Sequence, residues 1–311
     1  MAHITFVHGI ANKPPEADLH RVCRDALGDG DDPLPLGDLG VTSSCVYWAD
    51  VLYSDPDTDL AAYEGVLENS PEAVDGAGDV AMPVGATPEE RAFLSGLRSK
   101  LTTLDEVEIA SGREPPPAAA QAALERVPLP WFVKQPFLAA FLRDVHHYLF
   151  DTEHSPRPGT TFRVQQEIRR RFVAKLADAA VTRPHVIVSH SMGTVIAYDC
   201  LKRVTDCAPV DGLMTLGSPL GLDEVQDQLQ PGWSRENGFP DGRLGGGWIN
   251  VFDRLDPVCG FDPALANDYR RAGALEVDDR AVTNPGVWRH SSGKYLRQPT
   301  VRAGLRKLLQ L

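Results

Sequence analysis

Short apolar runs alternate along the chain with segments of helical periodicity. The apolar runs predict buried strands at 4–9, 45–53, 184–190, 212–218 and 248–252, with a weaker strand at 275–279. The periodic segments predict helices at 16–27, from about 160 to 180, at 192–204 and from about 299 to 309. Because continuous apolar strands that alternate with helices build a parallel sheet covered on both faces, we predict a largely parallel α/β core.

The interval 54–158 breaks this rhythm with Pro-, Gly- and Asp-rich loops and three predicted helices that no strand separates. The first helix starts at a capping box, TPEE at 87–90, the second follows PPP at 115–117, and the third spans about 135–150. Apolar residues recur at helical spacing in the first and third helices: Leu94, Leu97, Leu101 and Leu104, then Leu138, Phe141, Leu142, Val145 and Leu149. We expect a cap or lid over the carboxyl ends of the strands, and a helical layer that only stabilises the fold is the alternative.

Composition and hydropathy limit the partners of this protein. Lys and Arg number 31 against 43 Asp and Glu, a formal charge of −12, so neither nucleic acid nor an anionic membrane surface is an expected partner. The most apolar stretch, 127–142, is interrupted by three prolines and a lysine, so no transmembrane segment is predicted. The N-terminal segment lacks the pattern of a signal peptide, and we expect a cytoplasmic protein.

The cysteines and clustered histidines do not predict a metal site. The five cysteines are scattered, without a C-x-x-C pair, which argues against a disulfide framework and a structural zinc site. His146 and His147 lie near His154 in sequence, but adjacent residues of a helix point to different faces. We therefore expect no metal.

The segment 184–204 (PHVIVSHSMGTVIAYDCLKRV) passes from a predicted strand directly into a predicted helix, with Ser191 at the turn. The pattern small-x-Ser-x-Gly in this context is typical of a nucleophile elbow. Strand and helix backbones pass close together there, which requires small neighbours; Gly193 meets this, and Ser189 replaces the commoner glycine. A serine-rich turn that binds phosphate, or no ligand, is the alternative.

A serine nucleophile needs a general base, and the base needs an acid that orients it. If the order along the chain is Ser, acid, His, the base is His290, the one histidine after Ser191. The segment that follows the strand at 248–252 offers Asp253 and Asp256 as acids. Asp256 is favoured because the following proline fixes its backbone in an extended conformation.

Asp253 stays open as the alternative acid. It could otherwise end the strand or pair with Arg254 or Arg243. For the oxyanion hole, we expect the turn that ends the first strand, FVHGI at 6–10, to direct a backbone N–H toward Ser191, and the Met192 N–H at the start of the helix to supply the second donor.

Five features together resemble the α/β-hydrolase superfamily: FVHG at 6–9, SHSMG at 189–193, TLGSPLG at 215–221, NVFDRLDPV at 250–258, and His290. More narrowly, they resemble lipase/esterase-like members with a PGAP-type or bacterial lipase-like core. The resemblance covers about 3–53 and 160–311. It implies an eight-stranded, mostly parallel sheet and no metal or organic cofactor. It also implies a triad of Ser191, Asp256 and His290, with Ile10 and Met192 as oxyanion donors.

These features predict a single α/β-hydrolase domain over 1–311, with its core at about 1–53 and 159–311 and a mostly helical cap at 54–158. The expected activity is hydrolysis of a small-molecule carboxylic ester through an acyl-enzyme. Aromatic residues of the insertion suggest an acyl chain or another apolar substrate; these are Trp131, Phe132, Phe137 and Phe141. Alternatives on the same triad are a thioesterase, an amidase or peptidase, and an acyltransferase. A non-catalytic interaction protein and a lipase whose lid binds a membrane interface also stay open.

Overall fold

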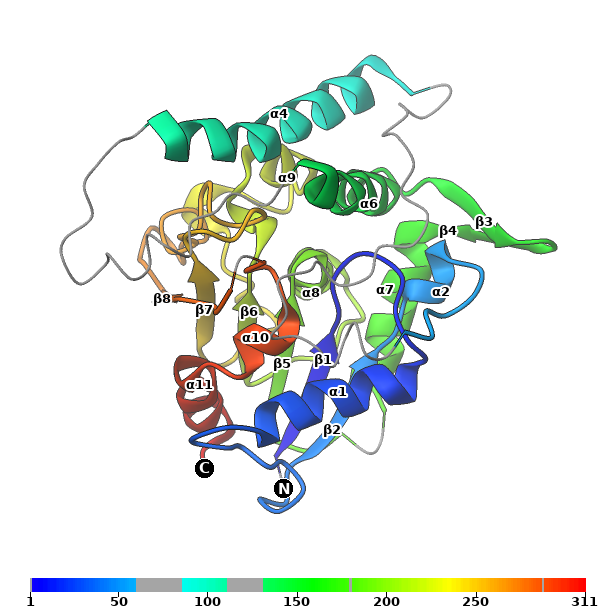
Figure 1. Ribbon diagram of the computed structural model, residues 1–311. Helices are drawn as coiled ribbons and strands as arrows, with labels where there is room; N and C mark the ends of the chain where they lie inside the picture. The colour runs from blue at the N-terminus through cyan, green and yellow to red at the C-terminus, as the bar shows by residue number, and fades with distance from the viewer. Residues whose placement is uncertain (1, 60–85, 111–130, 179–180, 287) are drawn as a thin grey trace.

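The central element of the fold is a parallel β-sheet. The computed structural model describes residues 2–59, 86–110, 131–178, 181–286 and 288–311. Within these residues the sheet has six strands in the order β2-β1-β5-β6-β7-β8, every pair parallel (Figure 1). The strands are β1 (His3–Val7), β2 (Thr42–Val46), β5 (His185–His190), β6 (Gly212–Leu216), β7 (Trp248–Asp253) and β8 (Val277–Val282).

The α/β architecture predicted from the sequence is therefore confirmed, with two corrections. The expected strand at 45–53 begins earlier and ends at Val46, because residues Ala49–Leu52 form the short helix α2. The expected eight-stranded sheet has six strands in the described part of the chain.

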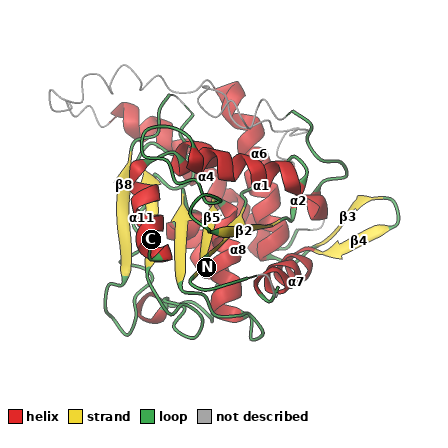
Figure 2. Cartoon of the chain, turned by 90° about the horizontal axis from the view of Figure 1, so that it is seen from below, coloured by secondary structure: helices red, strands yellow, loops and turns green. Residues whose placement is uncertain are grey.

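Helices cover both faces of the sheet (Figure 2). One face carries α1 (Glu16–Gly28), α10 (Ser292–Leu296) and α11 (Pro299–Leu309), and the other carries α7 (Val164–Leu176) and α8 (Met192–Arg203). Val186 and Val188 of β5 belong to the core under α1 and α11, whereas Ile187 belongs to the core under α7 and α8. Since successive strand side chains point to opposite faces, a fully apolar strand supplies both cores.

The register of the sheet brings the chemically interesting segments to one edge. His190 at the end of β5 pairs with Leu216 at the end of β6, and Leu216 pairs with Val251 of β7. Because all these strands run parallel, the residues that follow each of them meet at the carboxyl edge. Ser191, Gly217 and the loop after β7 therefore lie together, although they are far apart in sequence.

The insertion contributes α4 (Pro88–Ala110) and α6 (Trp131–Leu149), which lie at the carboxyl end of the strands (Figure 1). The predicted capping box starts α4: the Thr87 N–H donates to Glu90 Oε2 at 2.6 Å and the Glu90 N–H donates to Thr87 Oγ1 at 3.2 Å. The predicted apolar stripes are buried where their side chains are described: Leu94, Leu97, Phe141, Leu142, Val145 and Leu149. Leu101 and Leu104 lie within α4 and Leu138 lies within α6, but their side chains are outside the described part of the structure. The helix expected after residue 117 lies outside the described residues.

The insertion is not purely helical. An antiparallel hairpin of β3 (Glu153–Arg157) and β4 (Thr160–Arg163), which no sequence pattern predicted, spans the boundary between the insertion and the core and projects from the body of the molecule (Figures 1 and 2). The predicted helix from about 160 to 180 consequently begins only at Val164. Short helices complete the fold: η2 (Pro219–Gly221), α9 (Asp223–Gln228) and η3 (Arg235–Asn237).

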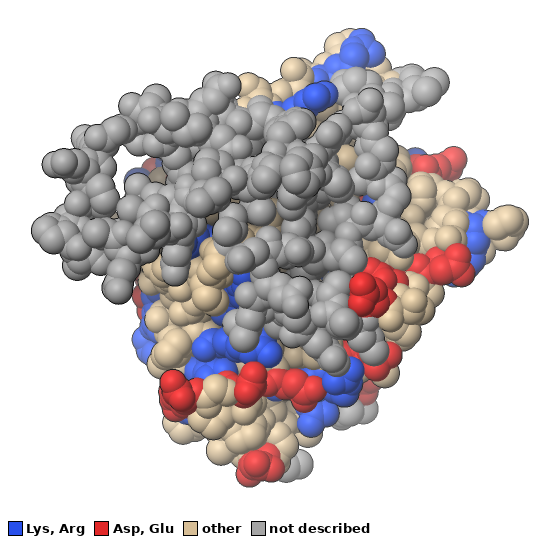
Figure 3. Space-filling view, in the orientation of Figure 1, with Lys and Arg blue, Asp and Glu red and all other residues tan. Residues whose placement is uncertain are grey.

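The surface mixes charges of both signs. Figure 3 shows Lys and Arg side chains beside Asp and Glu side chains over the described lower part of one face. Among the ion pairs around α1 and α11 are Arg297–Asp29 at 3.2 Å and Arg306–Asp32 at 2.9 Å. In the described part of the chain, every helix is too short or too polar to traverse a bilayer.

Candidate active site

Ser191 occupies a strained turn between β5 and α8. Its φ of 54° and ψ of −130° lie in a region that residues other than glycine rarely adopt. The Ser191 N–H donates to Leu216 O at 3.0 Å, which ties the turn to the end of β6. Such a backbone costs about 1–3 kcal/mol and persists only where its surroundings hold it. The turn thus has the sharp strand-to-helix geometry expected of a nucleophile elbow.

Close backbone packing explains the glycines around this turn. A Cβ atom at Gly193 would lie 2.4 Å from Val7 O, and one at Gly9 would lie 2.8 Å from Ser191 Cβ. The loop after β1 therefore presses against the elbow, and Ile10 is the next residue of that loop. Ser189 is compatible with the tight packing because its hydroxyl is buried and donates to Met214 O at 3.2 Å.

Asp256 and His290 form a buried pair, as expected for a triad acid and base. His290 Nδ1 lies 2.9 Å from Asp256 Oδ1 and 2.8 Å from Oδ2. Burial by itself would raise the pKa of Asp256, but His290 and the hydrogen bonds donated by Tyr295 and Val258 outweigh it and hold the pKa below its ordinary value. An ionised carboxylate only accepts hydrogen bonds, so His290 carries its proton on Nδ1 and keeps Nε2 as the basic nitrogen.

Asp253, the alternative acid, contacts a different partner. Its Oδ2 accepts from the Asn284 N–H at 2.7 Å and from Arg289 Nη1 at 3.2 Å, and its Oδ1 accepts from the Leu255 N–H at 2.9 Å. Burial raises the pKa of Asp253, against the hydrogen bonds and the Arg289 charge that lower it. The pairing with Arg254 or Arg243 considered from the sequence is therefore wrong: the arginine partner is Arg289.

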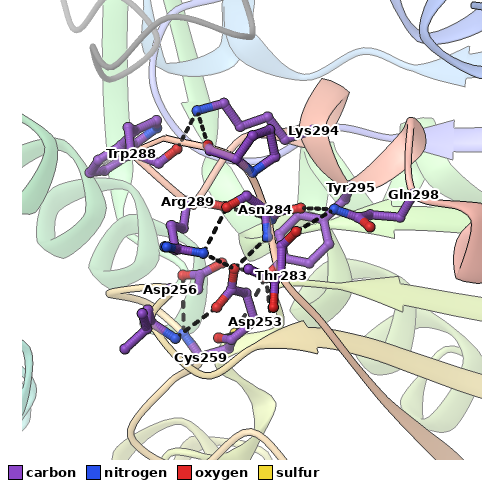
Figure 4. A network of polar contacts seen from close by, with 12 residues as sticks. Asp253, Asp256, Cys259, Thr283, Asn284, Trp288, Arg289, Lys294, Tyr295 and Gln298 are labelled. Atoms are coloured by element: carbon purple, nitrogen blue, oxygen red, sulfur yellow. Dashed lines mark hydrogen bonds and ion pairs between the residues drawn. The ribbon is translucent and has the colours of Figure 1, made fainter. Parts of the chain in front are cut away.

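Asp253 is part of a network that holds the segment before His290 (Figure 4). Arg289 Nη1 also donates to Asn284 O, and Asn284 Nδ2 donates back to Arg289 O, both at 2.7 Å.

Lys294 Nζ donates to Pro285 O at 2.8 Å and to Trp288 O at 2.6 Å. Burial, with the nearby Arg289 charge, lowers the pKa of Lys294 to about 8. These contacts close the loop between β8 and α10.

Tyr295 joins the two aspartates and was not identified from the sequence. Its hydroxyl donates to Asp256 Oδ2 at 2.7 Å and accepts the Asp253 N–H at 3.0 Å. Gly217, with a φ of 54°, leaves room for this arrangement, because a Cβ there would lie 2.8 Å from Asp256 Oδ2 and 3.2 Å from His290 Nδ1. No spacing pattern relates Tyr295 to loop residues so distant in sequence, so only the folded chain reveals it.

His8 fixes the loop that carries Ile10. Its Nε2 accepts the Trp48 N–H at 3.0 Å, its Nδ1 donates to Gly9 O at 2.8 Å, and its ring stacks on Trp48 at 4.5 Å. Burial, with the nearby Lys13 charge, lowers the pKa of His8 to about 3. A neutral histidine held by two hydrogen bonds orients the loop and is not placed to transfer protons.

The structure thus brings the predicted site residues to one edge of the sheet. Asp256 and His290 are hydrogen-bonded, and the ring of His190, the residue before Ser191, lies 4.6 Å from the His290 ring. Ser191 Oγ is buried and makes no hydrogen bond within the described residues. Met192 is the first residue of α8, and its side chain is buried.

Other candidates from the sequence have structural partners. His146 Nε2 contacts Glu90 Oε1 at 3.0 Å, His147 Nδ1 contacts Thr152 Oγ1 at 2.5 Å, and His154 Nε2 contacts Leu52 O at 3.0 Å. Phe141, one of the aromatic residues expected to favour an acyl chain, is fully buried in the core instead. Trp131, Phe132 and Phe137 have side chains outside the described part of the structure.

Comparisons with known proteins find only distant similarity. No protein-family model matches the chain, and no curated protein matches it. Acetyl xylan esterase 1 from Thermoanaerobacterium sp. JW/SL YS485 aligns over 100% of this chain and 74% of its own, with 10% identity and a TM-score of 0.36. An uncharacterized protein from Pseudomonas aeruginosa aligns over 99% of this chain and 46% of its own, with 11% identity and a TM-score of 0.35. What the site does is therefore inferred from its own geometry.

Proposed function

We propose that this protein is a serine hydrolase of the α/β-hydrolase type that cleaves carboxylic esters. One observation carries the proposal: Ser191 stands in a strained strand-to-helix turn at the sheet edge that also holds the Asp256–His290 pair. A serine in such a turn presents its hydroxyl above the sheet, and an imidazole oriented by a carboxylate is the base that activates it. The narrower resemblance to lipases with a PGAP-type or bacterial lipase-like core belongs to the same proposal.

In the proposed mechanism, His290 Nε2 takes the proton of Ser191 as its oxygen attacks the ester carbonyl. The resulting imidazolium is stabilised by Asp256, and it then protonates the departing alcohol. Water attacks the acyl-enzyme with His290 again as base, which releases the acid and restores Ser191.

The N–H groups of Ile10 and Met192 are proposed to hold the negative oxygen of the tetrahedral intermediate. The contact of Gly9 with Ser191 Cβ supports the first donor, and the position of Met192 at the N-terminus of α8 supports the second. Loss of one such donor costs on the order of 100- to 1,000-fold in kcat.

The insertion at 54–158 is proposed to act as the cap of a single domain. The position of α4 and α6 at the carboxyl end of the sheet supports this reading. Ser191 and Asp256 are 0% exposed and His290 is 2% exposed, so a substrate must be admitted past the segments that cover them. The proposed substrate is a small-molecule ester, and an apolar acyl chain is its proposed refinement. The proposed location of the protein is the cytoplasm.

Labelling with a fluorophosphonate tests the proposed nucleophile. We expect the wild type to be labelled and Ser191→Ala to be unlabelled, because the reagent phosphonylates an activated serine. Ser218→Ala is the matched control: Ser218 is also buried at this end of the sheet, but its hydroxyl contacts Thr194 at 2.7 Å and caps η2. An unlabelled wild type contradicts the proposal and favours a non-catalytic interaction protein, whereas labelling that survives in Ser191→Ala contradicts the assignment of Ser191 as the nucleophile.

Substrate panels separate the remaining activities. p-Nitrophenyl esters of increasing chain length measure the acyl preference, and matched thioesters and amides test for a thioesterase and an amidase or peptidase. Product analysis with added alcohol detects acyl transfer, and liposome sedimentation detects a lipase that binds an interface. We expect the ester to be the best substrate and its free acid to be the main product.

A further inference from the structure

A buried carboxylate of the insertion contacts the loop after β1. Asp144, on α6, has a fully buried side chain, and its Oδ2 accepts the backbone N–H of Ala11 at 2.8 Å. The two residues are 133 positions apart in sequence. Ala11 directly follows Ile10, the residue proposed to donate its N–H to the oxyanion.

Ala11 needs this support because its backbone is strained. Its φ is 68°, in the left-handed region that favours glycine. A residue with a Cβ adopts this conformation only at an energetic cost, so its surroundings must determine the conformation. Rotation of Ala11 out of this region would turn the Ile10–Ala11 peptide, and through the Ile10 Cα it would displace the adjoining Gly9–Ile10 peptide that carries the Ile10 N–H.

Asp144 is itself held firmly. Tyr53 OH donates to its Oδ2 at 3.0 Å, and Arg143 Nε donates to its Oδ1 at 3.0 Å. Arg143 Nη2 also donates to Tyr53 OH, and the guanidinium lies 4.7 Å from the centre of the Tyr53 ring. Because both oxygens have charged or polar donors, the carboxylate is fixed in position and keeps one oxygen directed at Ala11.

We infer that Asp144 is a positioning residue through which the inserted helix α6 fixes the loop 9–11 after β1, called here the oxyanion loop because it carries the Ile10 N–H. The inference rests on the proposed serine hydrolase function and adds to it a contribution of the insertion beyond covering the site. Asp144 acts through Ala11 on the Ile10 N–H and does not touch the substrate. Its effect is greatest in the transition state, where the negative oxygen forms.

The test compares rates of fluorophosphonate labelling, which require no knowledge of the natural substrate. Asp144→Ala removes the acceptor of the Ala11 N–H. The rate constant for labelling of this variant is expected to be about 10- to 100-fold below that of wild type, the range for a misplaced catalytic donor. Asp144→Asn keeps one oxygen for the Ala11 N–H while losing the ion pair with Arg143, so its rate is expected to stay within about threefold of wild type. Asp144→Ser, polar but too short to reach Ala11, replaces the alanine variant if that variant does not fold.

Asp199 supplies the matched control. It is a fully buried carboxylate that accepts from Tyr148 OH on α6 at 2.6 Å and from Arg169 Nε on α7 at 2.7 Å. Within the described residues, none of its hydrogen bonds or ion pairs goes to the loop 9–11. Asp199→Ala is expected to lower the melting temperature at least as much as Asp144→Ala and to label at the wild-type rate. With a p-nitrophenyl ester, Asp144→Ala is expected to lose kcat with little change in KM.

The outcomes are distinguishable. An unlabelled wild type overturns the proposed function together with this inference. A labelled wild type with an equally reactive Asp144→Ala overturns the inference alone. Equal losses in Asp144→Ala and Asp144→Asn also overturn it, because they assign the effect to the ion pair with Arg143.

Discussion

Replacement of Asp256 by asparagine separates the two candidate acids, because the surrounding donors dictate how the new amide must lie. The Val258 N–H donates to Oδ1 at 2.8 Å, and the Cys259 N–H approaches the same oxygen at 3.4 Å. The amide oxygen therefore takes the Oδ1 position, and the NH2 group faces His290 and Tyr295.

This orientation reverses the imidazole tautomer. His290 Nδ1 would accept from the amide, so its proton would move to Nε2, where it blocks transfer from Ser191. In Ser-His-Asp enzymes the equivalent change lowers kcat by about 10,000-fold, and we expect a loss of that order. Tyr295 OH would also lose its acceptor, at a cost of about 1–3 kcal/mol of unfolding free energy.

The assay is steady-state hydrolysis of a p-nitrophenyl ester, with thermal unfolding measured in parallel. Adding Tyr295→Phe to Asp256→Asn removes the orphaned hydroxyl but also the acceptor of the Asp253 N–H, so the double variant should recover neither stability nor kcat. Asp253→Asn is the control. It weakens the buried ion pair with Arg289, which should lower the unfolding free energy by about 3 kcal/mol, but it leaves the Asp256 carboxylate hydrogen-bonded to His290. The reasoning is refuted if Asp256→Asn keeps kcat within about tenfold of wild type while Asp253→Asn abolishes activity.

Three further predictions follow from single contacts. Gly217→Ala places a Cβ 2.8 Å from Asp256 Oδ2 at a φ of 54°, so we expect at least about a tenfold loss of kcat in the same ester assay, and wild-type kcat would contradict the packing argument. His8 has a pKa of about 3, below its ordinary value, so between pH 6.5 and 3 the unfolded chain binds a proton that the folded chain excludes. The unfolding free energy should then fall as pH falls, by up to about 1.4 kcal/mol per pH unit from this residue. Denaturant titrations at several pH values should show that the unfolding free energy of His8→Gln depends less steeply on pH than that of wild type. Thr87→Ala removes the cap of α4 and should cost about 1 kcal/mol in the same titrations, and no change would show that α4 adds nothing to global stability.

Much of the site followed from local chemistry in the sequence. The elbow is readable because strand, turn and helix are consecutive, so the required small residues stand at fixed offsets from Ser191. His290 was reached by elimination, and the hydrogen bond between His290 Nδ1 and Asp256 Oδ2 at 2.8 Å agrees with the preferred acid. The boundaries of α11 were predicted as observed, because Pro299 starts the helix and its apolar spacing is regular.

Contacts between distant segments were decided by tertiary structure alone. The sequence by itself determined the α/β class, the elbow and the order of the candidate catalytic residues, because each depends on periodicity or on residues close together in the chain. It carried no signal for Tyr295 between the two aspartates, for Arg289 as the partner of Asp253, or for Asp144 as the acceptor of the Ala11 N–H. Those contacts exist because parallel strands end at one edge and helices from the insertion and the C-terminal region pack over it. Which polar groups then meet depends on strand register and helix placement, and neither follows from local sequence.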